Sequence, residues 1–153
     1  MKKLFLPIIA FALSMLVTSC IGGDVYETNE SYSDLELQTM TVTVQPDQWE
    51  VDGTPGTEGA TLISEWSVRE ITQTVLNYGS VQVSYFFYDE HNRYVEHPLP
   101  YVLPYYDTPS NIIETYRCFY ERGKITFVIE ASDFQCVIPR DPVCFKIAVL
   151  SPR

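Results

Sequence analysis

Residues 112–130 read I-I-E-T-Y-R-C-F-Y-E-R-G-K-I-T-F-V-I-E, and this stretch decides the fold class. The dipeptide Arg122-Gly123 suits a tight turn, and the residues on both sides of it are rich in aromatic and β-branched types, which favour strands. After the turn, apolar residues alternate with more polar ones, the apolar set being Ile125, Phe127 and Ile129. A period of two places one set of side chains on a buried face. The stretch therefore predicts an antiparallel hairpin of strands 112–121 and 124–130.

The same alternation continues on both sides of this hairpin. Upstream, T-M-T-V-T-V at 39–44 predicts a half-buried strand, and Trp49 is expected to anchor the core. Residues 51–59 have the composition of a loop. We expect the remaining strands at 60–68, 81–88, 93–97 and 145–149, with 81–88 paired to 93–97 across the polar turn at 89–92.

One segment has a helical spacing instead. Ile71 and Val75 lie four residues apart, and Gly79 is placed for a C-terminal cap, so we expect a short helix at 70–79. Together these patterns predict an all-β fold, an antiparallel β-sandwich of about seven strands with one short helix. The order of the strands does not follow from the local patterns.

The stretch H-P-L-P-Y-V-L-P-Y-Y-D-T-P at 97–109 contains four prolines. Proline cannot donate a hydrogen bond to a neighbouring strand, so this stretch is either an edge strand or an extended crossing. Three tyrosines lie on it, Tyr101, Tyr105 and Tyr106. We expect exposed rings here to bind a ligand, either a glycan or a protein. The alternative is that these tyrosines are packed and purely structural.

The N-terminus has the features of an exported lipoprotein. Lys2-Lys3 is basic, and the apolar run Leu4–Val17 is shorter than the roughly 20 residues that a membrane-spanning helix needs. Val17-Thr18-Ser19-Cys20 resembles a bacterial lipobox. The resemblance implies cleavage before Cys20 and attachment of acyl chains, such as palmitate, to that residue, which would hold the protein on a membrane. An ordinary signal peptide followed by a chance cysteine is the alternative.

These features divide the chain into a signal peptide (1–19), a polar tether (20–37) and a single β-sandwich domain (38–153). Ile21 replaces the Asp that marks inner-membrane retention in many lipoproteins, which favours the outer membrane. The mildly acidic tether resembles a surface-export signal, so the cell surface is slightly favoured over the periplasmic face. The formal net charge of −10 argues against binding to nucleic acid or to an anionic lipid surface.

Three cysteines follow Cys20, namely Cys118, Cys136 and Cys144. Cys136 and Cys144 are equidistant from Arg140, so a hairpin centred on that residue would place them opposite each other and allow a disulfide in an oxidising compartment. Three reduced, buried cysteines are the alternative. Cys118 alternates with tyrosines and is expected in the core.

No sequence motif indicates catalytic residues, a metal site or a cofactor. Gly-x-Ser-x-Gly, His-Glu-x-x-His, Cys-x-x-Cys and a phosphate-binding loop are all missing from the sequence. The turn 89–92 has oxygen ligands for a hard cation, but a polar hairpin tip is the favoured interpretation. A small hydrolase remains a remote alternative, which requires convergent carboxylates or Cys118 beside His91 or His97.

Short segments scattered over residues 38–150 carry a family resemblance: Ile71-Thr72, Pro98-Leu99-Pro100-Tyr101-Val102, Ile125-Thr126-Phe127, Ser132-Asp133-Phe134 and Phe145-Lys146-Ile147-Ala148-Val149. They resemble a family of Bacteroides-type lipoproteins of unknown function with a small all-β domain. Some of its members carry this domain after collagen-like Gly-X-Y repeats. This chain has no such repeat, and its Pro104-Tyr105 replaces a more polar pair. The resemblance implies no activity and no functional residue.

The sequence thus leads to two main hypotheses. The first is a lipid-anchored, non-enzymatic β-sandwich of the cell envelope that binds a glycan or protein ligand through its aromatic and proline-rich edge. The second is a structural accessory lipoprotein of an envelope complex, in which the tyrosines of that edge are mostly buried.

Overall fold

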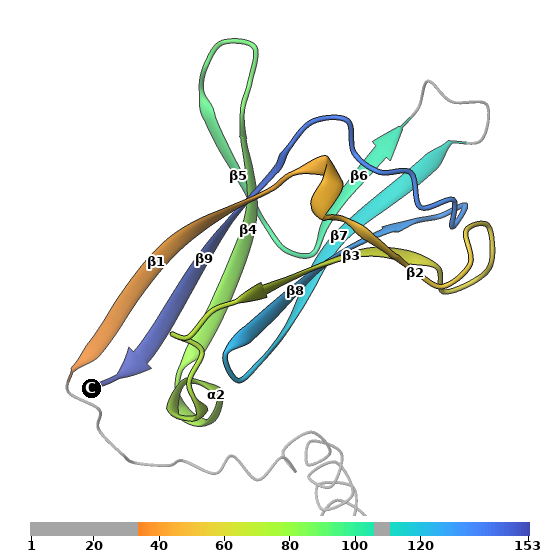
Figure 1. The fold of residues 1–153 in the computed structure, drawn as a ribbon. Coiled ribbons are helices and arrows are strands. Elements are labelled where there is room, and N and C mark those ends of the chain that lie inside the picture. Colours follow the sequence, from red (N-terminus) through yellow and green to blue (C-terminus); the bar gives the residue numbers. More distant parts are fainter. Residues whose placement is uncertain (1–33, 106–110) are drawn as a thin grey trace, which may run out of the picture. The chain divides into compact units, whose positions relative to one another are not determined.

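The computed structural model describes residues 34–105 and 111–153, which form two antiparallel sheets packed face to face (Figure 1). The fold is the predicted antiparallel β-sandwich with one short helix. The elements of the described residues are β1 (Leu35–Val44), the 3-10 turn η1 (Pro46–Gln48), β2 (Glu50–Asp52), β3 (Thr61–Ser67), α2 (Gln73–Tyr78), β4 (Ser80–Tyr88), β5 (Tyr94–Pro98), β6 (Tyr101–Tyr105), β7 (Ile112–Glu121), β8 (Lys124–Ala131) and β9 (Val143–Pro152).

The two sheets contain strands that are far apart in the sequence. One sheet has four described strands in the order β1-β9-β4-β5, and the other has five in the order β2-β3-β8-β7-β6. β1 lies beside β9 along its whole length, which brings the end of the chain next to the start of β1 (Figure 1). Four connections between the described strands cross from one sheet to the other, and two of them, β1 to β2 and β5 to β6, join strands at opposite edges.

Two of the expected hairpins are confirmed. β7 pairs with β8 and ends in the pair Glu121–Lys124, so Arg122-Gly123 forms the tight turn. β4 pairs with β5 from Ser84–Pro98 to Tyr88–Tyr94. These are local pairings, in which a short turn fixes the register of the strands that it joins.

The core lies between the inner faces of the two sheets. Phe127 of β8 stacks on Phe145 of β9, with ring centroids 4.0 Å apart and an interplanar angle of 7°. Trp49 is buried, as predicted. Leu62 of β3 and Val149 of β9 are also buried, because the period-two pattern turns one side of each strand inward. Complete burial of such side chains stabilises the fold by about 1.5–3 kcal/mol each.

The boundaries near the start of the domain differ most from the prediction. β1 begins at Leu35, four residues before the expected strand and inside the expected tether. Its first residues pair with the last residues of β9, so long-range pairing extends a strand whose local sequence lacks a strong signal. β2 forms at Glu50–Asp52, partly inside the expected loop, because those three residues pair with β3.

The short helix α2 is confirmed within the expected range. The side-chain oxygen of Thr72 accepts a hydrogen bond from the backbone N–H of Val75, which caps the N-terminus. Gly79 follows the last turn, but its φ of −105° is not left-handed. Glycine is required there for space, because a Cβ atom would collide with the carbonyl oxygen of Leu150 on β9.

The expected hairpin centred on Arg140 is not formed. β8 belongs to the five-stranded sheet and β9 to the four-stranded sheet, so residues 132–142 cross from one sheet to the other instead of folding back. This crossing is irregular, and Phe134 and Cys136 adopt positive φ angles in it. None of the helices in the described part of the chain is long and apolar enough to span a membrane.

Candidate binding surfaces

The proline-rich stretch forms an edge strand, one of the two alternatives that the sequence left open. Among the described strands, β6 is the last strand of its sheet, and β5 is the last strand of the other sheet. Leu99-Pro100 joins them, so the two edges lie on the same side of the sandwich. Proline is tolerated at this position because an edge strand has one side without a partner strand.

An aromatic cluster fills the space between these two edges. It consists of Tyr85, Phe87, His97, Tyr101 and Tyr116. The rings of Tyr101 and His97 stack with centroids 4.3 Å apart, and Tyr85 stacks on both Tyr101 and Tyr116 at 5.4 Å. Stacked rings contribute about 0.5–1.5 kcal/mol per pair beyond their buried area, so the cluster holds the edges of the two sheets together.

A carboxylate on β7 accepts hydrogen bonds from two tyrosines. The hydroxyls of Tyr105 and Tyr116 both donate to Oε2 of Glu114, at 3.1 and 3.0 Å. Burial, together with the nearby charge of Glu114, raises the pKa of Tyr105 to about 12 and raises the pKa of Tyr116 strongly. Both phenols therefore stay protonated at neutral pH and keep their donor protons for the carboxylate.

The outer face of this edge is apolar. Val102 and Pro104 of β6 alternate with the inward-facing Tyr101, and Ile113 lies directly opposite Pro104 on β7. Val102 is 51% exposed, and Pro104 and Ile113 are exposed as well. We call these three residues the apolar edge patch. Tyr105, which is 39% exposed, lies at the end of the same strand.

The three candidate ligand-binding tyrosines are not equivalent in the structure. Tyr101 is half-buried, because its ring is part of the aromatic cluster. Tyr105 keeps part of its ring exposed while its hydroxyl binds Glu114. Tyr106 lies outside the described residues, and so does Cys20, the proposed lipid attachment site.

Cys136 and Cys144 are free thiols in the structure, and Cys118 is also free. Of the two alternatives that the sequence left open, the disulfide is not formed, because the crossing at 132–142 replaces the hairpin that would have placed the two cysteines opposite each other. Cys136 donates to the carbonyl of Phe134, and Cys144 lies 3.6 Å from the Thr43 hydroxyl. Burial raises the pKa of Cys118 to about 11, which keeps that thiol protonated at neutral pH.

A groove that the sequence did not predict lies on the outer face of the five-stranded sheet. Its volume is about 570 Å³, and its floor includes Thr126 and Val128 of β8. The alternation along β8 assigns these residues to the solvent side, yet Val128 is only 1% exposed. β8 is the central strand of its sheet, so longer side chains on the neighbouring strands β3 and β7 cover it. No local pattern in the sequence indicates that side chains of neighbouring strands bury Val128.

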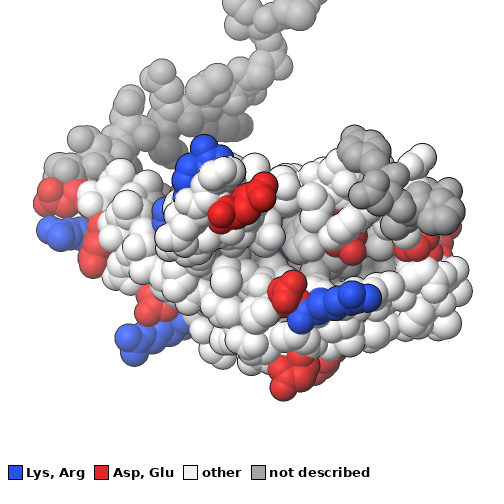
Figure 2. Space-filling view, turned by 90° about the horizontal axis from the view of Figure 1, so that it is seen from above, with Lys and Arg blue, Asp and Glu red and all other residues white. Residues whose placement is uncertain are grey.

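Opposite charges lie close together over much of the surface. On the face shown in Figure 2, lysine and arginine side chains lie beside acidic ones, and no broad area of positive charge forms there. Examples of such pairs in the described chain are Lys146 with Glu96 at 3.0 Å and Arg117 with Glu130 at 2.7 Å.

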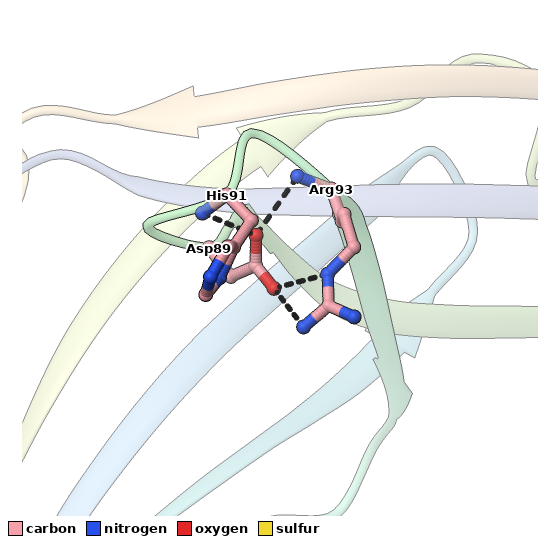
Figure 3. Close-up of polar contacts among 3 residues, drawn as sticks. All are labelled: Asp89, His91 and Arg93. Atoms are coloured by element: carbon pink, nitrogen blue, oxygen red, sulfur yellow. Dashed lines mark hydrogen bonds and ion pairs between the residues drawn. The ribbon is translucent and has the colours of Figure 1, made fainter.

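The turn at 89–92 is stabilised by its own acidic residue. The carboxylate of Asp89 accepts hydrogen bonds from the backbone N–H groups of His91 and Arg93, each at 2.9 Å, and forms an ion pair with the Arg93 guanidinium at 2.7 Å (Figure 3). These interactions lower the pKa of Asp89, led by its hydrogen bond with the Arg93 backbone. The described residues contain no group of three or more His, Cys, Asp or Glu side chains that could hold a metal ion.

No protein-family model, curated protein or solved structure matches the chain. A functional assignment for this chain therefore rests on its own residues and surfaces.

Proposed function

We propose that this protein is a lipid-anchored, non-enzymatic domain of the cell envelope that binds another protein through the edge formed by β6 and β7. The observation that carries the proposal is the apolar edge patch of Val102, Pro104 and Ile113, with the partly exposed Tyr105 beside it. Contiguous apolar side chains on a protein surface mark interaction sites, because leaving them in water is unfavourable.

The chemistry of this edge favours a protein ligand over a glycan. Its exposed side chains are mainly apolar, and the buried centres of protein interfaces are more apolar than the rest of the surface. A sugar would instead need an accessible aromatic face. Tyr101 stacks on His97 and on Tyr85, which leaves little of its face for a ligand. Tyr105 exposes part of its ring, but its hydroxyl is bound to Glu114.

The lipobox-like segment ending at Cys20 supports the anchoring part of the proposal. A lipid at that position would hold the domain at a membrane, and Ile21 favours the outer membrane, with the cell surface as the preferred side. The resemblance to Bacteroides-type lipoproteins supports the same location. The test is labelling of cells with radioactive palmitate, in which Cys20→Ser removes the label that the wild-type chain carries.

The binding surface is tested with a matched pair of substitutions. Val102 and Val51 are both exposed valines, at 51% and 44%, and they lie on opposite edges of the same sheet. The full-length variants Val102→Asp and Val51→Asp would be immobilised from detergent and incubated with solubilised envelope proteins. We expect Val102→Asp to retain about tenfold less of the protein that the wild-type chain captures, since burying an unpaired carboxylate in an interface is costly. Equal retention by both variants would contradict the assignment of the edge.

A structural accessory role is the second candidate, and the aromatic cluster is the observation that favours it. Tyr101 is half-buried and packs against the core, as that role requires. Under that role, Tyr101→Ala destabilises the domain while Val102→Asp leaves its associations unchanged.

If the ligand of the β6–β7 edge is a glycan, capture of envelope protein fails, and binding to envelope polysaccharide is lost in Val102→Asp instead.

A further inference from the structure

We propose that the groove on the outer face of the five-stranded sheet binds a neutral oligosaccharide. This site is separate from the apolar edge patch, and the inference does not depend on the proposed protein ligand. Its volume of about 570 Å³ lies within the range of roughly 300–1,000 Å³ that is usual for small-molecule sites.

The floor of the groove is built from short side chains on neighbouring strands. Thr126 and Val128 come from β8 and Thr61 comes from β3, and all three are buried although they point to the outer face of the sheet. They lie between longer side chains of the flanking strands, so the sheet surface is hollow along β8. A ligand in this hollow would contact mainly the longer side chains that flank it, because the floor residues themselves are at most 8% exposed.

An exposed aromatic ring lies at the side of the hollow. Phe119 of β7 is opposite Thr126 and is 54% exposed. One face of a pyranose ring carries mainly C–H groups, which pack well against an aromatic side chain. Phe119 thus supplies the apolar platform that a sugar needs, which Tyr101 at the other candidate site does not.

Charged groups of both signs line the groove, and most of them are paired, although Asp52 is not among the paired ones. Lys124 forms ion pairs with Glu65 at 3.1 Å and with Glu121 at 2.8 Å, and Arg117 pairs with Glu130 at 2.7 Å. A cationic ligand would have to compete with Lys124 for its two carboxylate partners, and the overall charge of −10 repels an anion. Hydroxyl groups both donate and accept hydrogen bonds, so a neutral polyhydroxyl ligand can donate to the carboxylates and accept from the lysine and arginine side chains.

The test uses the full-length protein in detergent micelles and isothermal titration calorimetry. The probes are cellohexaose, maltohexaose and β-1,4-mannohexaose as neutral sugars, with hexagalacturonate as the charged comparison. We expect at least one neutral hexamer to bind with a Kd below about 1 mM, and Phe119→Ala to weaken it by about tenfold or more, which corresponds to about 1.4 kcal/mol. Phe119 is on the surface, so its removal leaves the core intact.

A control variant shows where the sugar binds. Tyr88→Ala removes a comparably exposed ring from the other sheet. It should leave the affinity for the hexamer within about twofold of the wild-type value. The proposal is overturned if no neutral hexamer binds at about 5 mM, if Phe119→Ala binds as tightly as wild type, or if hexagalacturonate binds more tightly than the neutral sugars.

Discussion

Replacing Tyr116 by Phe removes one hydroxyl from the aromatic cluster and changes how stability depends on pH. Tyr116 is 5% exposed, and its hydroxyl donates to Glu114. Burial and the Glu114 charge raise the pKa of Tyr116 in the folded protein, whereas an unfolded tyrosine keeps a pKa of about 10. The folded state therefore retains a proton that the unfolded state loses at high pH. Stability from this group is complete below about pH 10 and declines as the pH rises toward the folded-state pKa.

The size of the expected loss of stability follows from the pKa of tyrosine in the unfolded state alone. At about pH 11, ionisation of an unfolded tyrosine lowers the free energy of the unfolded state by about 1.4 kcal/mol, and at about pH 8 it has almost no effect. In Tyr116→Phe, the residue at position 116 cannot ionise, so the unfolded state is not stabilised in this way at high pH. At pH 8 the variant should be less stable than wild type by about 1.5–3 kcal/mol, because it lacks a hydrogen bond to a charged group. The difference in the free energy of unfolding between wild type and variant should therefore be smaller by about 1.4 kcal/mol at about pH 11 than at about pH 8.

Urea unfolding of both proteins at about pH 8 and about pH 11, followed by fluorescence, measures this difference. Titration of other groups affects wild type and variant alike and cancels in the comparison. Tyr120→Phe, on the same strand but 44% exposed, serves as the control for the loss of a hydroxyl and should cost much less stability at about pH 8 than Tyr116→Phe. A difference between wild type and Tyr116→Phe that is the same at both pH values would mean that Tyr116 is not buried between the sheets.

Three further predictions test other parts of the structure. Phe127→Ala should lower the free energy of unfolding by about 3–5 kcal/mol in urea titrations, because it removes one ring of the stacked core pair; a loss below about 1 kcal/mol would contradict that packing. Gly79→Ala should lower the free energy of unfolding by about 1–3 kcal/mol in the same assay, because its methyl group collides with the Leu150 carbonyl oxygen. An increase in stability would contradict the close contact between Gly79 and Leu150. Cys118 should react with iodoacetamide at neutral pH about a hundredfold more slowly in the folded chain than in urea, because burial raises its pKa from 9.0 to about 11, and equal rates would place the thiol at the surface.

The sequence predicted the features of the fold that depend on neighbouring residues. The alternation around Phe127 and the tight turn at Arg122-Gly123 were enough to place the β7–β8 hairpin in the correct register. The spacing of Ile71 and Val75 also indicated the short helix, although Ile71 precedes its N-cap Thr72 and the helix begins at Gln73. In each case the pairing partners are close along the chain, so local patterns and turn chemistry decide the outcome.

The features that were missed depend on contacts between distant segments. The crossing at 132–142 could not be distinguished from a hairpin, because the sheet to which β9 belongs is set by its partners β1 and β4. The aromatic cluster combines residues from β4, β5, β6 and β7, and no spacing in the sequence connects them. The burial of Val128 on the outer face arises from the side chains of adjacent strands, which the alternation along one strand cannot report.

The measurement that tests the central proposal most directly is photocrosslinking in living cells. A photoreactive amino acid would replace Val102 in one full-length variant and Val51 in the other, two exposed positions on opposite edges of the same sheet. If the β6–β7 edge binds an envelope protein, irradiation should give one discrete crosslinked species from position 102 and none from position 51. Equal crosslinking at both positions, or none at position 102, would contradict the proposal.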